Sequence, residues 1–281
     1  VPLLLSCRAG QSVSSLLRTW NEGVPLEVGS SLLRGWSGLR PGELLHIHLH
    51  ARSIRRHLKH DASKRGSHRQ SNHQTLALVD SLNRVVRRLE PPADASLWLK
   101  YYGDTIYSPG DTMEKERILK EWIARANPSR VWDLGSNTGR YARLASERGI
   151  PTIAMDADDA CVDSTYREAR SRADSYLTPL VMNLANPSPS LGWAHDERAS
   201  LADRGPADLV LYLGIIHHMR FTYLIPLAQQ LAYLAKVGKN VIVEWVPEDD
   251  PNCLHFSAHA NIKSSYSTAI FESLLDDYCL V

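Results

Sequence analysis

The chain has 281 residues, of which 43% are hydrophobic, enough for the core of one large or two modest domains. Its 32 basic and 31 acidic residues nearly cancel, so net charge identifies no partner. The four cysteines lie far apart without a C-x-x-C pair, which excludes a disulfide framework and a zinc knuckle and is typical of a reducing cytoplasm. The longest apolar runs fall far short of the ~20 residues that span a membrane, so we expect a cytoplasmic protein.

Residues 1–90 are predicted to be a helical, basic region, because apolar residues recur at helical spacing in 12–20, 43–60 and 74–90. Between Arg52 and Arg88 there are ten Lys or Arg and two acids, a net charge of +8. Such a run can bind phosphates, but basic residues more often cluster in this way because they form the solvent-exposed face of a helix. It holds no Phe, Tyr or Trp on which bases could stack, which argues against single-stranded nucleic acid.

Three histidines in this region, His46, His48 and His50, alternate as they would on one face of a strand, a spacing that can bind a metal. On a helix only His46 and His50 share a face, and no carboxylate stands at ligand spacing. We therefore predict helix histidines and no metal. Pro91 and Pro92 end the last helix, which predicts two domains, 1–90 and 91–281.

The second domain alternates short apolar strands with helices. Strands are predicted at 131–134, 151–155, 176–184, 207–213 and 240–246, and helices at 140–148, 159–170, 224–236 and 268–277. This order predicts an α/β fold with a mostly parallel, Rossmann-like sheet that carries helices on both faces.

The first strand ends in Asp133 and passes through a Gly-x-x-x-Gly turn, Gly135 to Gly139, into a helix. Gly135 allows a tight turn, and Gly139 is expected to let the backbone approach a ligand. A dinucleotide site would prefer G-x-G-x-x-G, with glycine where Asn137 stands, because pyrophosphate rests against the helix N-terminus. A strand-end aspartate suits a cationic ligand instead. A Rossmann-like domain for NAD, or one without a ligand, remains an alternative.

The second strand ends in Asp156, 23 positions after Asp133, where an acid can accept hydrogen bonds from ribose hydroxyls. Both acids therefore belong at the carboxyl ends of neighbouring strands, the edge at which open α/β sheets bind ligands. This placement predicts one shared nucleoside site.

D-x-G-x-x-x-G followed by a strand-end acid resembles motifs I and II of the class I S-adenosylmethionine-dependent methyltransferases, and 131–246 keeps that family's order of elements. The resemblance implies S-adenosylmethionine as cofactor, with a cationic amino group and sulfonium near Asp133. Asn183 stands where that family more often has Asp against adenine. The implied cofactor residues are Asp133, Gly135, Ser136, Asn137, Gly139, Asp156, Ala157, Asn183, Leu184 and Leu213.

Further segments are similar to a bacterial group of nodulation-protein-like methyltransferases: 98–137, 186–189 with 192–193, 213–219, and 246–247 with 250–251. In that group a longer N-terminal region precedes the part present here, and class I sheets usually close with a hairpin that would begin near 278–281. We therefore expect a chain that is truncated at both ends.

His217 and His218 follow the fourth strand, a position that faces the transferred methyl group in the family. A histidine there could take a proton from an acceptor hydroxyl or orient it. Neighbours on one helical turn are expected to face apart, so one of the two is predicted to be structural. Glu244, which follows the fifth strand, is a further catalytic candidate, with a capping or salt-bridging acid as the alternative.

The predicted function is transfer of a methyl group from S-adenosylmethionine to an unidentified acceptor, a small molecule by preference. Two alternatives stand beside it: a cofactor-binding partner or regulatory module without catalysis, and an RNA methyltransferase that uses the basic helices. Intact Asp133, Gly135, Gly139 and Asp156 favour a site that binds cofactor. The acceptor, the attacking atom and the oligomeric state are left open.

Overall fold

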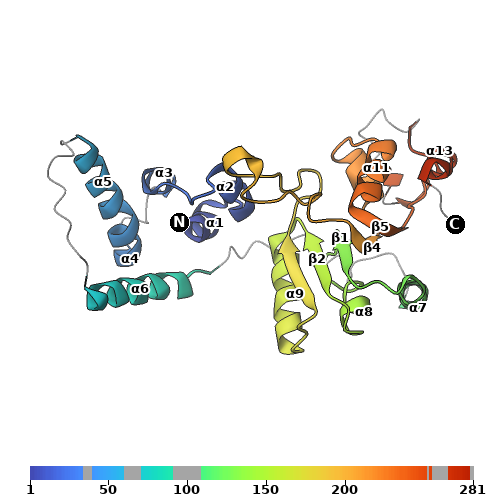
Figure 1. Ribbon diagram of the computed structural model, residues 1–281, viewed down its shortest axis with the longest axis horizontal. Coiled ribbons are helices and arrows are strands. Elements are labelled where there is room, and N and C mark those ends of the chain that lie inside the picture. The colour runs from blue at the N-terminus through green and yellow to red at the C-terminus, as the bar shows by residue number, and fades with distance from the viewer. Residues whose placement is uncertain (34–39, 60–70, 91–108, 252, 255–264, 279–281) are drawn as a thin grey trace. The chain divides into compact units, whose positions relative to one another are not determined.

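The computed structural model describes residues 1–33, 40–59, 71–90, 109–251, 253–254 and 265–278. The chain divides into two compact units, residues 1–94 and 95–281 (Figure 1). Each unit has its own hydrophobic core. The predicted boundary at Pro91 and Pro92, and the basic residues Lys64, Arg65 and Arg69, lie outside the described residues. Among the residues that are described, no helix is both long and apolar enough to cross a membrane.

The first unit is helical, as predicted. Its elements are α1 (Pro2–Ala9), α2 (Val13–Thr19), α3 (Leu26–Leu32), α4 (Pro41–Glu43), the π-helix η2 (Leu44–Leu49), α5 (His50–Lys59) and α6 (Asn72–Arg87). Its core consists of apolar side chains from several of these helices: Leu4, Leu5, Leu16, Val24, Leu33 and Ile47. Helices α1 and α3 were not predicted, because each spans only two turns and carries too few apolar repeats.

Helix α6 begins with a capping box in which Ser71 and Gln74 bond each other's backbone N–H. Its predicted apolar stripe is present but exposed, since Leu76 keeps 66% of its surface and Val79 keeps 55%. Helical periodicity therefore identified the element correctly, while within the described residues the face that it defines is not buried.

The histidines of the first unit lie in η2 and at the start of α5, so the helical interpretation holds. His46 Nε2 lies 2.8 Å from Ser81 Oγ, and His48 Nδ1 lies 2.9 Å from Ser30 Oγ. The two rings therefore hydrogen-bond to different helices. Within the described part of the chain, no group of three His, Cys, Asp or Glu could hold a metal ion.

The second unit contains one five-stranded, all-parallel sheet in the order β3-β2-β1-β4-β5. Its strands are β1 (Val131–Leu134), β2 (Thr152–Asp156), β3 (Leu177–Val181), β4 (Ala207–Tyr212) and β5 (Gly238–Val243). The predicted Rossmann-like α/β architecture is confirmed. Strand β1 pairs with β2 on one side and β4 on the other, so the direction of winding reverses there. Ligands bind at such a switch point, outside the carboxyl ends of the strands.

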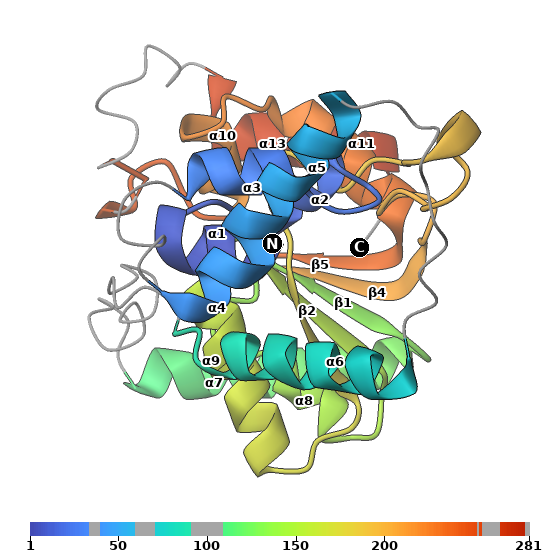
Figure 2. The same cartoon turned by 90° about the vertical axis from the view of Figure 1, so that its left-hand side faces the viewer.

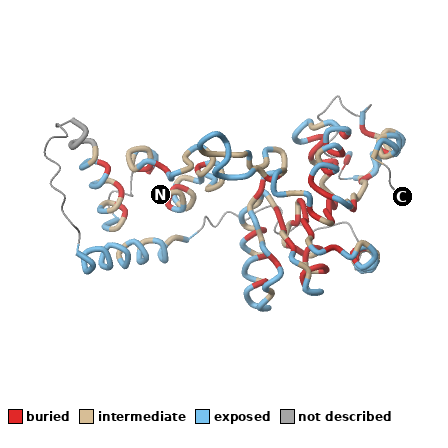
Figure 3. The backbone as a smooth tube through the Cα atoms, in the orientation of Figure 1, coloured by how far each residue is buried: buried red, intermediate tan, exposed pale blue. Residues whose placement is uncertain are grey.

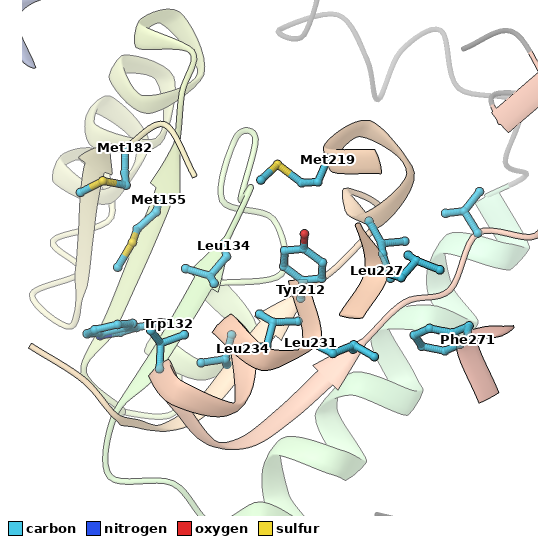
Figure 4. Close-up of a cluster of buried hydrophobic side chains, with 14 of the residues drawn as sticks. Trp132, Leu134, Met155, Met182, Tyr212, Met219, Leu227, Leu231, Leu234 and Phe271 are labelled. Carbon is cyan, nitrogen blue, oxygen red and sulfur yellow. The ribbon is translucent and has the colours of Figure 1, made fainter. Parts of the chain in front are cut away.

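Helices cover both faces of this sheet (Figure 2). The helices are α7 (Pro109–Ala126), α8 (Arg143–Ser146), α9 (Asp159–Ser171), α10 (Ile216–Phe221), α11 (Leu227–Val237) and α13 (Thr268–Leu275), with short 3₁₀ turns η4 (Trp193–His195) and η6 (Asp276–Tyr278). Side chains alternate along a strand, so Val131 packs under α7 and α8 while Trp132 packs under α11. The central strands are consequently buried (Figure 3), and Figure 4 shows the core on the α11 side.

Element boundaries differ from the predicted ones mainly near the carboxyl ends of the strands. Strand β1 has the predicted bounds, but β5 ends at Val243 rather than at 246. The helix predicted at 140–148 is only α8, because positive φ angles at Asn137 and Gly139 keep the preceding residues in turns. Helix α7, of 18 residues, was not predicted.

Candidate functional site

A cavity of about 890 Å³ lies in the second unit at the carboxyl ends of the strands. The loops that follow β1, β2, β3, β4 and β5 line it, and α7 supplies a further wall. Twelve of the thirteen predicted site residues line this cavity: Asp133, Gly135, Ser136, Asn137, Asp156, Ala157, Asn183, Leu184, Leu213, His217, His218 and Glu244. The topology therefore brings residues together that are up to 111 positions apart in the sequence.

Gly139 is the exception, because it does not line the cavity. Its φ is 70°, and a Cβ there would lie 2.6 Å from Thr165 Cγ2 of α9. A left-handed turn packed tightly against α9 is therefore sufficient to account for this glycine, and its predicted close approach to a ligand stays a prediction. Gly135, at φ 79°, does line the cavity, and a Cβ there would lie 2.6 Å from Ile215 Cγ2.

Asp156 fastens two of the loops to each other. The backbone N–H of Asn137 donates to its Oδ2 at 2.7 Å, and the backbone N–H of Asp158 donates to its Oδ1 at 2.9 Å. Burial raises the pKa of the Asp156 carboxyl, and these N–H donors oppose that shift because they favour the charged form. The same residue also lines the cavity.

Asp133 is the most deeply buried acid of the cavity, with 2% of its surface exposed. The backbone N–H of Ala142 donates to its carboxylate, yet Oδ2 has no hydrogen-bond partner among the described residues. Burial, followed by the charge of Asp156, raises the pKa of Asp133 to about 7, while Lys115 acts in the opposite direction. An orphaned buried carboxylate oxygen is costly unless a ligand compensates it.

Lys115 of α7 is a cavity residue that sequence reasoning missed. Its Nζ lies 2.7 Å from Glu244 Oε2 and 4.4 Å from the centroid of the Tyr141 ring. Glu244 follows Ile242 by two positions and therefore points to the α7 face of the sheet. Lys115 could have been found from its spacing, because residues at i, i+3, i+7 and i+10 lie on one face of a helix, and here that face lines the cavity: Thr112, Lys115, Leu119 and Trp122.

His217 and His218 both reach the cavity, contrary to the expectation that neighbours on one turn face apart. Their ring centroids are 4.1 Å apart, with the planes tilted by 39°. Burial lowers the pKa of His217 to about 3, helped by the neighbouring His218, and lowers that of His218 to about 4. Both rings are therefore neutral at pH 7.

Asn183 follows β3 and also lines the cavity. Its Oδ1 accepts a 2.9 Å hydrogen bond from the backbone N–H of Ala185, which fixes the side chain in an Asx turn. The amide thereby keeps its NH₂ group for other partners, whereas an aspartate in its place would offer acceptors alone.

The chain resembles nodulation protein NoeA. It is 32% identical to NoeA of Rhizobium meliloti (strain 1021) over 182 residues, which is 64% of the chain and 38% of NoeA. The predicted similarity to nodulation-protein-like methyltransferases is thereby confirmed, although the chain spans little more than a third of this relative's length. No family model matches the chain.

Solved structures give weaker likenesses. The bifunctional kinase-methyltransferase WbdD matches 60% of the chain and 36% of its own length, at 18% identity and a TM-score of 0.42. Magnesium protoporphyrin IX methyltransferase from Synechocystis PCC 6803 with bound SAH matches 64% of the chain and 80% of its own length, at 17% identity and a TM-score of 0.42. Likenesses at this level convey neither substrate nor mechanism.

Proposed function

We propose that the second unit binds S-adenosylmethionine in the cavity and transfers its methyl group to a small-molecule acceptor. The observation that carries this proposal is the Asp133 carboxylate, which is 2% exposed and has no partner for Oδ2 among the described residues. A cationic ammonium would compensate both its charge and its missing hydrogen bond, whereas a sulfonium would compensate its charge alone.

The charges of the cavity favour this cofactor over a dinucleotide. Among the described residues that line the cavity, six are Asp or Glu and one is Lys or Arg. In a dinucleotide site the pyrophosphate rests against the N-terminus of the helix that follows the glycine turn, but here that helix, α8, begins only at Arg143, which does not line the cavity. Acidic walls likewise oppose RNA phosphates, so they argue against the RNA methyltransferase alternative.

The residues present fit the parts of S-adenosylmethionine. Asp133 would pair with a cationic group, Asp156 would accept hydrogen bonds from ribose hydroxyls, and Asn183 with Leu184 would contact the adenine. Ala157 and the turn from Gly135 to Asn137 would supply the backbone surface between them. These assignments extend the sequence resemblance to side chains that share one cavity.

When bound, the cofactor supplies a methyl group that is already activated for in-line attack. His217 and His218, whose pKa values burial lowers to about 3 and about 4, are weak bases. Their contribution would therefore be to orient the acceptor, because alignment of the reacting groups accelerates methyl transfer even when neither histidine takes up a proton. Glu244, whose carboxylate lies 2.7 Å from Lys115 Nζ, would place a negative charge beside the loop after β4 that leads to the two histidines.

The proposed acceptor is a small, carbon-rich molecule. The cavity of about 890 Å³ lies near the upper end of the ~300–1,000 Å³ typical of ligand sites, which leaves room beside a cofactor. Besides Asp133 and Asp156, its walls include apolar and aromatic side chains: Ile118, Trp122, Met219, Tyr223 and Ile242.

Calorimetric titration of the chain with S-adenosylhomocysteine and with NAD tests the proposal. We expect S-adenosylhomocysteine to bind and to raise the melting temperature, and NAD to do neither. Asp133→Asn should weaken binding, whereas Asp163→Asn on the exposed face of α9 should not. Binding of NAD in place of S-adenosylhomocysteine would overturn the proposal. Transfer of a labelled methyl group to small molecules of a cell extract would separate an enzyme from a non-catalytic module.

A further inference from the structure

The α7 wall brings one cation into an otherwise acidic cavity. Lys115 is the only Lys or Arg among the described residues that line it. Its Nζ contacts Glu244 Oε2 at 2.7 Å, and both side chains are only about a quarter exposed, at 27% and 28%. Lys115 also lowers the pKa of Asp133, so its positive charge acts on the buried carboxyl of the cavity.

Three strand ends direct their side chains to this same wall. Asp133, Leu213 and Glu244 continue the alternation of Val131, Leu211 and Ile242, which pack under α7 and α8. A Cβ added to Gly214 would lie 3.3 Å from Glu244 Oε2, so the carboxylate lies against the backbone just after β4. The Lys115–Glu244 pair therefore lies at the carboxyl ends of β4 and β5, on the same face of the sheet as Asp133.

S-adenosylmethionine and S-adenosylhomocysteine have nearly the same shape and differ by one methyl group and one positive charge. Charges in the wall of their cavity therefore act on the difference between the two more than on their common parts. A lysine disfavours the sulfonium relative to the neutral thioether, and a carboxylate has the opposite effect.

We propose that Lys115 and Glu244 together set the discrimination between S-adenosylmethionine and S-adenosylhomocysteine, and hence the strength of inhibition by the product. This inference rests on the proposed function. In the paired state the two charges largely cancel, so the pair by itself favours neither S-adenosylmethionine nor S-adenosylhomocysteine strongly. Removing either partner leaves the other uncompensated, and the two removals shift the ratio in opposite directions.

The competing interpretation is an ion pair that only fastens α7 to the end of β5. Partly exposed pairs contribute only ~0–1 kcal/mol to stability, so a fastening role is compatible with the contact itself. A fastening role, however, predicts that both single variants loosen the same wall and weaken both ligands together. The signs of the two effects therefore separate the interpretations.

The test is the ratio of the two dissociation constants, measured by calorimetry on the chain and its variants. Lys115→Met should improve binding of S-adenosylmethionine relative to S-adenosylhomocysteine by about three- to tenfold, and Glu244→Gln should shift the ratio by a similar factor the other way. The double variant should return close to the original ratio. Lys115→Arg, which keeps the charge, should leave it unchanged.

Matched controls lie on the outer face of α7. Lys120 and Glu121 are exposed and do not line the cavity, so Lys120→Met and Glu121→Gln change the same charges without changing the ratio. Equal weakening of both ligands by Lys115→Met and Glu244→Gln, or a ratio that stays within twofold in both, would overturn the inference. If the unmodified chain binds neither ligand, it is the proposed function that fails.

Discussion

The backbone N–H of Asn137 donates a 2.7 Å hydrogen bond to Asp156 Oδ2, so the turn after β1 is held by the residue that ends β2. The second oxygen of the same carboxylate accepts from the N–H of Asp158 at 2.9 Å. One side chain thus shapes two of the loops that line the cavity. A residue assigned to the ribose from its spacing is for this reason also part of the architecture.

Removing that carboxylate should cost stability as well as affinity. Asp156→Ala leaves two backbone N–H groups without their acceptor, and we expect a loss of ~1–3 kcal/mol in the free energy of unfolding. Asp156→Asn keeps one acceptor oxygen and should lose less. Urea denaturation checks the stability, and calorimetry with S-adenosylhomocysteine checks the affinity. Asp163→Ala, on the exposed side of α9, is the control and should stay within ~0.5 kcal/mol of the original chain.

Asp133 should make the ligand-free protein less stable as the pH rises. Its pKa is about 7 in the folded chain and 3.8 as the ordinary value, so between these pH values the folded state binds the extra proton. The contribution of Asp133 to the free energy of unfolding therefore falls from about pH 4 to about pH 7 and is constant above. Asp133→Asn removes this slope, and at pH 8 it should be the more stable protein by up to roughly 4 kcal/mol. Equal stability of the two proteins at pH 8 would refute the assignment.

The same carboxyl should make cofactor binding depend on pH in the opposite sense. A cationic ligand prefers ionised Asp133, so affinity for S-adenosylmethionine should rise by up to about tenfold per pH unit below 7 and flatten above it. Asp156 titrates in the same cluster, so the slope belongs to the coupled pair. Calorimetry at pH 6 in two buffers with different ionisation enthalpies should show release of a proton on binding. Asp133→Asn should bind weakly and without this release.

The sequence was sufficient for the sheet and for most of the cavity. Short apolar strands that alternate with helices specify a parallel sheet, and the carboxyl ends of parallel strands meet at one edge. Asp133, Asp156, Asn183 and Glu244 were therefore expected together, and all four line one cavity. This inference needs only the order of the elements, which local patterns reveal.

Two features depended on contacts between distant residues and could not be predicted. A salt-bridging Glu244 was one of the predicted alternatives, but its partner Lys115 is 129 positions away in the sequence. Because α7 mixes polar and apolar residues on its cavity face, the sequence did not identify that partner. The π-helical stretch from Leu44 to Leu49 likewise displaces His46 and His48 from regular α-helical positions. Their serine partners, Ser81 and Ser30, become apparent only once the helices have packed.

The two cavity histidines should make the folded protein sensitive to acid. Their pKa values are about 3 and about 4 in the folded chain, against an ordinary value of 6.5, so below pH 6.5 the unfolded chain binds protons that the folded chain does not. The contribution of the two histidines to stability should therefore fall as the pH falls from about 6.5 to about 4, opposite in sign to that of Asp133, so each slope is read as the difference between a variant and the original chain. His217→Gln should reduce this loss by as much as ~1.4 kcal/mol per pH unit. His195, in an exposed turn of the same unit, supplies the control His195→Gln, which should leave the acid slope unchanged.

The variant Gly139→Ala separates two explanations for this glycine, close packing against α9 and close approach to a ligand. Gly139→Ala should lower the free energy of unfolding by more than Gly149→Ala, since both have positive φ but only at Gly139 would the Cβ lie 2.6 Å from another side chain, Thr165. The strain of the left-handed conformation, ~1–2 kcal/mol, is common to both variants, so the excess measures the contact. Adding Thr165→Ser removes the clashing methyl group while keeping the hydroxyl that donates to the Cys161 carbonyl, and should recover part of the excess. A Gly139→Ala protein of unchanged stability that no longer bound S-adenosylhomocysteine would instead favour the ligand explanation.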